Sequence, residues 1–274
     1  MQYSDLHIHS RYSDGTLWPE EIVSIASKKG VKCISITDHD TIESQYALQE
    51  LESNSIRIIP GVELSTEYEE KEIHILGYFI EIDNKELNQA FDQVKLSRRD
   101  RAVQIINKLN ELGLNVSFDE ISTETTSIGR PHIAKLLVEK GYAKSVKEAF
   151  QHYLIKGKPA YVDRYKIHYK QALKLISNAN GIPVLAHPGE IYKGISLEEL
   201  VKEFKVYGLK GLEVFHPSHS SREANDYYNL AKKYSLAITG GSDCHGVYVR
   251  EDLLIGTVGI DENLTNKFLR TKIK

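Results

Sequence analysis

Near its start the chain reads Asp5-Leu6-His7-Ile8-His9-Ser10, a stretch in which polar and apolar residues alternate. Alternation with a period of two is typical of a β-strand, and it places His7 and His9 on the same face. Two adjacent imidazoles form half of a metal site, whereas an isolated His-x-His pair in a core is more often satisfied by hydrogen bonds. The choice between these interpretations depends on the rest of the chain.

Further acidic and histidine residues recur along the chain, nearly all of them directly after a short apolar run. They are Asp38, His39, Asp40, Glu63, His74, His187, Glu213, Asp243 and His245. Because the carboxyl ends of parallel strands converge when the strands close into a barrel, we expect these side chains to lie together. The recurrence predicts an α/β fold with its active site at the strand ends.

The apolar runs and the segments between them alternate as strands and helices. The predicted strands are 31–37, 56–62, 73–78, 182–186, 211–215 and 236–240, and the predicted helices are 16–29, 41–53, 196–204 and 221–234. Pro19 near the start of the first helix and Gly30 just beyond its end occupy the usual positions of these residues. Repeats of strand and helix at this spacing predict βα units with a parallel sheet.

One region interrupts this pattern. No segment between residues 84 and 161 has the character of a strand, whereas helical patterns cover 85–112 (as one or two helices), 118–122, 131–140 and 145–153. We expect residues 84–161 to form a small helical lid inserted into the catalytic barrel of residues 1–83 and 162–274, because barrel loops accept insertions. The basic cluster Arg98-Arg99-Asp100-Arg101 is expected to form a solvated helix face.

Composition excludes several classes of protein. A length of 274 residues with 41% hydrophobic residues suits one α/β barrel without a second full domain. The net charge of −3 gives no overall basic surface for long nucleic acid. Cys33 and Cys244 do not make a disulfide framework, which favours a reducing cytoplasm. No run of about 18 apolar residues occurs, so we expect neither a signal peptide nor a membrane partner.

Longer motifs carry a resemblance to a known family. They are DLHIHS at 5–10, Asp14 within YSDG, TDHD at 37–40, PGVELS at 60–65, IHILGY at 73–78, AHPG at 186–189, GLEVFHPSHS at 211–220 and GSDCH at 241–245. Over nearly its whole length the chain resembles the polymerase and histidinol phosphatase (PHP) superfamily of metal-dependent phosphoesterases. The resemblance implies a distorted (β/α)7 barrel with an inserted helical lid that holds up to three metal ions.

The family pattern implies a set of metal ligands in this sequence. It assigns the first ion to His7, His9, Glu63 and Asp243, the second to Glu63, His74 and His187, and the third to Asp14, His39 and His245. Neutral imidazoles combined with carboxylates suit Mn²⁺, Zn²⁺ or Fe²⁺ better than Ca²⁺ or Mg²⁺. We therefore expect two to three divalent transition-metal ions as cofactors.

Residues beside these ligands are expected to have smaller roles. Three carboxylates are as suited to orienting ligands as to binding metal, namely Asp5, Asp38 and Asp40. Glu213 is expected either to orient a ligand or to contact substrate. Cys244 is expected to pack in the core, because strand alternation points it away from its neighbours, and Tyr161 is the tyrosine placed near the site. Three histidines are expected in packing or at the surface, namely His132, His152 and His168.

The motif Gly129-Arg130-Pro131-His132 resembles a PHP subgroup that dephosphorylates nucleoside monophosphates and 3',5'-bisphosphates and whose relatives trim short RNA from the 5' end. We expect a phosphomonoesterase that acts on a small phosphorylated nucleotide through a metal-activated hydroxide. The alternatives are a 5'-3' exoribonuclease on short single-stranded RNA, a histidinol-phosphate-type phosphatase and a non-catalytic metal-binding module. The intact ligand set speaks against the last of these. The sequence carries no signal for an oligomeric state.

Three residues are candidates for holding the substrate. Pro131 suits the first turn of a helix, whose free N–H groups favour phosphate, and Arg130 adds a planar set of donors. His216 and His219 follow a predicted strand at the end where barrel loops cover the site, and His219 is preferred. His219 or Asp14, acting through water, is expected to provide the proton for the leaving group.

Overall fold

The computed structural model describes residues 3–51, 56–121, 128–163, 165–191, 194–246 and 253–272. The strands are β1 (Ser4–Ile8), β2 (Cys33–Ile36), β3 (Arg57–Ile58), β4 (Gly61–Tyr68), β5 (Lys71–Tyr78), β6 (Ile167–His168), β7 (Ile182–Leu185), β8 (Gly211–Phe215) and β9 (Ala237–Gly240). The helices are α1 (Pro19–Lys28), α2 (Glu43–Gln49), α3 (Lys85–Glu111), α4 (Arg130–Glu139), α5 (Val146–Ala149), α6 (Tyr169–Asn178), α7 (Leu197–Val206), α8 (Ser221–Lys233) and α9 (Glu262–Thr271). Short 3₁₀ turns cover Phe118–Glu120 and Pro188–Glu190, and a π turn covers Phe150–Leu154.

The strands form two sheets that together make a distorted barrel. The smaller sheet has the order β1-β2-β3, and the larger one has the order β6-β4-β5-β7-β8-β9. Isolated bridges connect the sheets on both sides, with His39 opposite Glu63 and Ile8 opposite Cys244. The arrangement agrees with the predicted α/β barrel class, although its described strands do not form one continuous closed ladder.

One strand runs against the prediction of a parallel sheet. β5 is antiparallel to both β4 and β7. The chain reverses between β4 and β5 through Glu69 and Glu70, which both have positive φ, as a two-residue hairpin requires. Two glutamates are an unusual choice for such a turn, so the local residues do not predict it. The predicted strand 56–62 is also divided at Ile59 and Pro60, and the second part continues to Tyr68.

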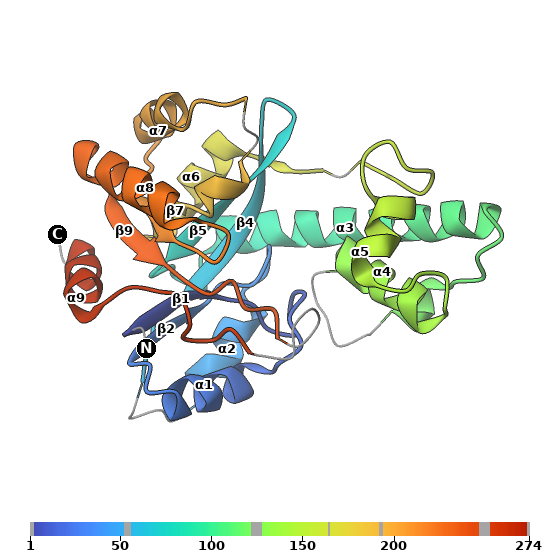
Figure 1. Ribbon diagram of the computed structural model, residues 1–274, viewed down its shortest axis with the longest axis horizontal. Coiled ribbons are helices and arrows are strands. Elements are labelled where there is room, and N and C mark those ends of the chain that lie inside the picture. The colour runs from blue at the N-terminus through green and yellow to red at the C-terminus, as the bar shows by residue number, and fades with distance from the viewer. Residues whose placement is uncertain are drawn as a thin grey trace.

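The apolar faces of the helices pack on the sheets (Figure 1). α6 and α7 bury residues such as Leu173 and Phe204 against the larger sheet, and α1 buries Ile22 against the smaller one. Pro19 is at the first turn of α1, and Gly30 just after it has a positive φ of 74°, as the predicted helix limits require. Cys244 lies in the core around the smaller sheet, which confirms its packing role. The ends of two predicted helices, at residues 52–53 and 122, lie outside the described residues.

The segment between β5 and β6 is helical, and its described residues contain no strand. α3 is one helix of 27 residues, whose first half packs on the barrel through residues such as Phe91. Its second half joins a separate apolar cluster with α4 and α5, including Ile105 and Leu137. Figure 1 shows this part projecting to one side of the sheets. No helix among the described residues is long and apolar enough to cross a membrane.

Candidate metal centre

The first strand supplies two histidines to the centre. β1 places His7 and His9 side by side, as their alternation predicted, with Nε2 atoms 3.1 Å apart and both side chains buried. Behind His7, the Glu213 carboxylate accepts a hydrogen bond from Nδ1 at 3.0 Å and another from the backbone N–H of His187 at 2.7 Å. Glu213 is fully buried. Of its two expected roles, it therefore has the orienting one and not the substrate contact.

Glu63 lies in the middle of the cluster, on β4. Its Oε1 is 3.0 Å from His74 Nδ1 and 3.0 Å from His187 Nε2. Its Oε2 faces three further histidine nitrogens, His7 Nε2 at 3.2 Å, His9 Nε2 at 3.2 Å and His39 Nδ1 at 3.1 Å. Burial works against the charge of Glu63, but the histidines around it, His39 foremost, hold its pKa well below the usual value. An ionised carboxylate with one oxygen toward each group of histidines has the geometry of a bridging ligand.

Asp14 and His245 form a part of the cluster nearer the surface. Asp14 Oδ1 lies 3.3 Å from His245 Nε2 and 3.8 Å from His9 Nδ1, and Oδ2 lies 4.0 Å from His39 Nε2. Burial works against the charge of Asp14, but His245 and His39 hold its pKa well below the usual value. An ionised carboxyl group suits metal binding, and the expected acid role of Asp14 stays a prediction.

Asp243 connects these parts. Its Oδ1 lies 3.3 Å from His7 Nε2 and 3.0 Å from His9 Nε2. The chain after β9 runs beside β1, where the Asp243 N–H donates to the His7 carbonyl at 2.8 Å. Gly241 permits this approach, because a Cβ there would lie 2.3 Å from the His7 nitrogen. Asp243 and His187 have positive φ values of 48° and 23°, the kind of backbone strain that collects at functional sites.

These donors fit divalent metal ions. Three groups have ligand atoms within 4.8 Å of one another, namely His9, Asp14, His39 and His245; His7, His9 and Asp243; and His39, Glu63 and His74. Within the described residues, His9 Nδ1 is buried and has no hydrogen-bond partner. Burial lowers the pKa of His39 to about 3. The groups contain the predicted ligands, with His187 joining through Glu63, but His9 and His39 each belong to two groups.

Two of the neighbouring carboxylates hold the backbone that carries the ligands. Asp5 accepts hydrogen bonds from the N–H groups of Ser242 at 2.9 Å and Gly256 at 2.8 Å, and burial raises its pKa to about 6. Asp38 accepts from the Ser10 N–H at 2.7 Å. Both carboxylates therefore fix the segments around the histidines and lie outside the ligand groups.

His216 and His219 contact protein groups through both ring nitrogens, and their expected substrate roles stay predictions. Nδ1 of His216 accepts the Ser218 N–H at 3.2 Å, and its Nε2 faces Asp243 Oδ2 at 3.3 Å, so His216 orients a ligand. Nδ1 of His219 donates to the Val214 carbonyl at 2.9 Å, and Nε2 accepts the Gly189 N–H at 3.1 Å. Both nitrogens of His219 are thus hydrogen-bonded to the backbone, and its expected roles as phosphate ligand and proton donor stay predictions.

The remaining singled-out residues are not members of the ligand groups. His132 and His168 accept backbone N–H groups at the starts of α4 and α6, and His152 is exposed. These positions confirm the packing or surface roles expected for the three histidines. The Tyr161 hydroxyl donates to the carboxylate two residues further on, at 2.6 Å, and Tyr161 is not among the described residues of the cavity beside the cluster. The charges of Arg101 and Arg130, which line that cavity, act on Tyr161, so its expected place near the site stays a prediction.

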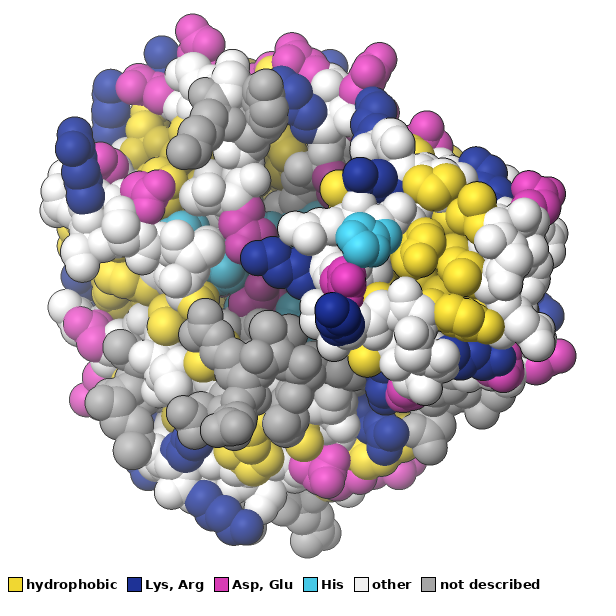
Figure 2. Space-filling model, turned by 45° about the vertical axis from the view of Figure 1, so that its right-hand side comes forward, with side chains coloured by type: hydrophobic (Ala, Val, Ile, Leu, Met, Phe, Trp, Pro, Cys, Tyr) yellow, Lys and Arg dark blue, Asp and Glu magenta, His cyan; other side chains and the backbone are white. Residues whose placement is uncertain are grey.

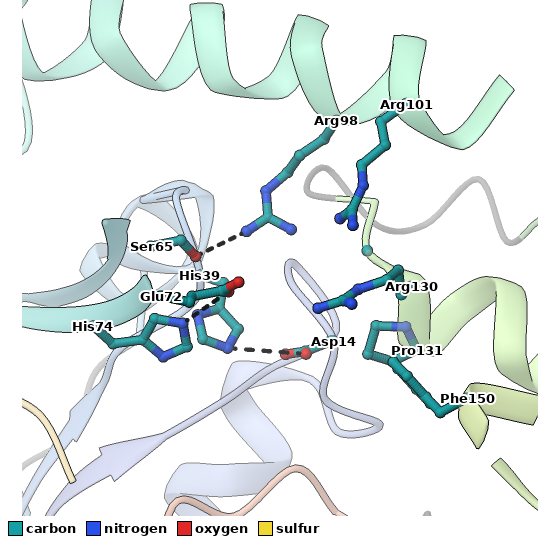
Figure 3. Close-up of a pocket in the computed structure, with 11 residues that line it drawn as sticks. Asp14, His39, Ser65, Glu72, His74, Arg98, Arg101, Arg130, Pro131 and Phe150 are labelled. Carbon is teal, nitrogen blue, oxygen red and sulfur yellow. Dashed lines mark hydrogen bonds and ion pairs between the residues drawn. The ribbon is translucent and has the colours of Figure 1, made fainter. Parts of the chain in front are cut away.

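One cavity separates the cluster from the helical insertion. The barrel contributes Asp14, His39 and His74 to its lining, and the insertion contributes Arg98, Arg101 and Arg130. In Figure 3 the three arginines point toward the histidines from the opposite side. Figure 2 shows basic, acidic and histidine side chains together in the hollow between the two parts of the molecule.

The expectation of a solvated basic face on α3 is wrong for two of its arginines. Arg98 and Arg101 are each only 8% exposed. Arg98 is bound by the Asp40 carboxylate, and Nε of Arg101 donates to the Val162 carbonyl at 2.8 Å. A signal was present in the sequence, because residues 94, 98, 101 and 105 follow one another at helical spacing and the first and last are apolar. That spacing places the arginines on the buried face.

Sequence reasoning also missed Glu72 on β5. Its Oε1 lies 3.3 Å from Nε2 of His74, whose Nδ1 faces Glu63. A carboxylate bound to the outer nitrogen of a ligating histidine fixes the orientation of the ring. The separation of two residues between Glu72 and His74 on one strand, which puts both on the same face, was the available signal.

Comparisons with known proteins extend over most of the chain. The model of the PHP domain family matches residues 5–203. The 3',5'-nucleoside bisphosphate phosphatase of Chromobacterium violaceum is 32% identical, over 88% of this chain and 86% of the relative. The 5'-3' exoribonuclease Rnm of Escherichia coli is 34% identical, over 88% of this chain and 84% of the relative. A crystal structure from Bifidobacterium adolescentis, classed as a metal-dependent phosphoesterase, is 26% identical with a TM-score of 0.86, covering 98% of this chain and 96% of that one.

Replacement of Glu63 by Gln should lower metal content more than replacement of any other single ligand. The amide keeps the shape of the side chain but removes the charge that faces both groups of histidines. Elemental analysis of protein purified without chelator measures the loss. Glu67→Gln on the same strand is the matched control, because Glu67 is part-exposed and pairs with Lys166 at 3.7 Å. Equal metal content in both variants would contradict the central role of Glu63.

Graded chelation should remove first the ion bound by Asp14, His39 and His245. The side chains of Asp14 and His245 are 14% and 31% exposed, whereas those of His7 and His9 are 0% exposed. Chelator therefore reaches this part of the cluster first. Metal content per chain, followed against chelator concentration, should fall in separate steps, with the first step absent from Asp14→Asn. A single step in both proteins would speak against this grouping of ligands.

Proposed function

Because the chain belongs to the PHP family, a family of metal-dependent phosphoesterases, we propose that it is a phosphomonoesterase that hydrolyses 3',5'-nucleoside bisphosphates. One observation carries the choice of substrate, namely Arg101 and Arg130, which line the cavity opposite the histidines (Figure 3). Metal ions neutralise the phosphate that reacts, so basic side chains on the opposite wall favour an ester with a second phosphate. The relative from Chromobacterium violaceum is named for a substrate of this kind.

We assign two to three divalent ions of Mn²⁺, Zn²⁺ or Fe²⁺ to the nine predicted ligands. Imidazole and carboxylate donors suit these metals, and the ligand atoms fall into three groups that share His9 and His39. Residues 84–161 act as a lid in this proposal. The support is that α3 and α4 carry the arginines that line the cavity, while the barrel carries the ligands.

Different residues of the chain are proposed to bind phosphate and to orient the metal ligands. Bound divalent ions lower the pKa of water and neutralise phosphoryl oxygens. Arg130 begins α4, lies over the Phe150 ring at 5.6 Å and points into the cavity, where its guanidinium suits a phosphate that does not react. Glu213 and Glu72 orient His7 and His74 from behind. Positioning and charge stabilisation of this kind account for most of the catalysis of phosphoryl transfer.

A 5'-3' exoribonuclease is the second candidate, and the same arginines favour it. A guanidinium that holds the outer phosphate contacts nonbridging oxygens, and these are present in a terminal monoester and in a diester alike. A short RNA could therefore occupy the place of the bisphosphate. The relative from Escherichia coli is named for this activity.

A panel of substrates distinguishes these functions. The metal-loaded enzyme is given a 3',5'-nucleoside bisphosphate, a nucleoside monophosphate and a 5'-phosphorylated trinucleotide RNA, and released phosphate or nucleotide is measured. We expect the bisphosphate to have the highest kcat/KM, because it places one phosphate at the metals and one at the arginines. Preference for the trinucleotide would favour the exoribonuclease, and equal rates for mono- and bisphosphate would contradict a role for the second phosphate.

Arg130→Ala should lower kcat/KM for the bisphosphate by about tenfold to a hundredfold, since a charge-assisted hydrogen bond contributes roughly 1.5–3 kcal/mol. Its effect on a monophosphate should be smaller, and metal content should stay unchanged. Lys135→Ala is the control on the same helix, because Lys135 is 47% exposed and pairs with Glu139. An equal loss of kcat/KM on mono- and bisphosphate would contradict a contact between Arg130 and the second phosphate.

A further inference from the structure

Arg98 differs from the other arginines of the cavity because a carboxylate of the barrel already binds it. Its Nε donates to Asp40 Oδ2 at 3.1 Å, and its NH2 group contacts the same oxygen. The NH2 group also donates to Ser65 Oγ at 3.1 Å. Arg98 is 8% exposed and Asp40 is 3% exposed, so this is a buried ion pair between the insertion and the barrel. Its charge is balanced before any substrate enters.

Asp40 in turn fixes the backbone of two metal-binding residues. It directly follows His39 and has a positive φ of 52°. Its N–H donates to the Glu63 carbonyl at 2.9 Å, and its Oδ1 accepts the Ser65 N–H at 2.8 Å. These bonds hold the segment 38–40 against β4 and place His39 opposite Glu63, at the isolated bridge that connects the two sheets. The separation of 3.1 Å between His39 Nδ1 and Glu63 Oε2 depends on this alignment.

Arg98 also lies at the junction of two apolar clusters along α3. Val94, one turn before it, packs in the barrel cluster, and Ala102, one turn after it, packs in the cluster of the insertion. Since α3 is continuous across this junction, the ion pair connects the insertion to the metal-binding segment through a single rigid element.

We propose that Arg98 is a positioning residue through which the helical insertion sets the alignment of His39 with Glu63. It acts on the affinity for metal and does not bind the substrate phosphate. The proposal rests on the metal-dependent function given above, but it concerns the centre and not the identity of the ester. Partners that orient metal ligands typically change metal affinity by about tenfold to a hundredfold when they are removed.

The test measures metal affinity without substrate. Apo protein is titrated with Mn²⁺ by calorimetry for the wild type, Arg98→Met, Asp40→Asn and Arg98→Lys. Arg98→Met and Asp40→Asn should weaken the least tightly bound Mn²⁺ by about tenfold or more, and Arg98→Lys should restore part of the affinity because it keeps the charge. Arg99→Met is the matched control, since Arg99 is exposed on the same helix and should behave as wild type.

Kinetics on the best phosphate ester of the panel provide the second measurement. Arg98→Met should lower kcat at limiting Mn²⁺, recover with excess Mn²⁺ and leave KM nearly unchanged. Unchanged Mn²⁺ affinity in Arg98→Met and Asp40→Asn would overturn the proposal, and a raised KM with normal affinity would identify Arg98 as a phosphate ligand instead. If Arg98→Met does not fold, the Mn²⁺ affinity of Asp40→Asn compared with that of the wild type tests the same ion pair through its partner in the barrel. The Mn²⁺ titration keeps its meaning if the substrate proves to be a different ester.

Discussion

A buried carboxylate surrounded by histidines is the interaction on which the site depends. Glu63 is fully buried, and five histidine side chains approach its two oxygens within 3.2 Å. A negative charge in such a place is costly unless positive charge or hydrogen bonds balance it. Those histidines come from four different segments, so the balance is reached only when β1, the loop at residue 39, β5 and the loop at residue 187 are all in place. The same four segments must therefore come together both for the ligands to meet and for the barrel to close.

The residues that the sequence singles out as ligands come together in the structure because their signal is local. Most of them follow or lie within a short apolar strand, and strand ends converge in this class of fold. His7 and His9 show this most clearly, since alternation alone gave their shared face. The antiparallel course of β5 was not predictable in the same way, because strand direction depends on a turn whose residues, Glu69 and Glu70, are atypical.

Contacts with partners that are distant in the chain are the part that local sequence patterns do not predict. His219 follows a strand end as a functional residue would, yet its nitrogens are used by the carbonyl of Val214 and the N–H of Gly189. Arg98 sits in a basic run that resembles a solvated helix face, yet Asp40 lies against it although it is 58 residues away in the chain. No local pattern reports such a pair. In this structure, charge runs were informative only when combined with the spacing of apolar residues on the same helix.

The junction between the two sheets has a consequence for how the fold is held together. At this junction the backbone pairing is reduced to single bridges, and one of them joins His39 to Glu63. Where an ordinary barrel has a continuous ladder of backbone hydrogen bonds, this junction has contacts between histidine and carboxylate side chains. The binding free energy of a metal ion held at such a place is also folding free energy. Divalent metal bound here therefore stabilises the closed barrel as well as supplying chemistry, and its removal is expected to lower the free energy of unfolding.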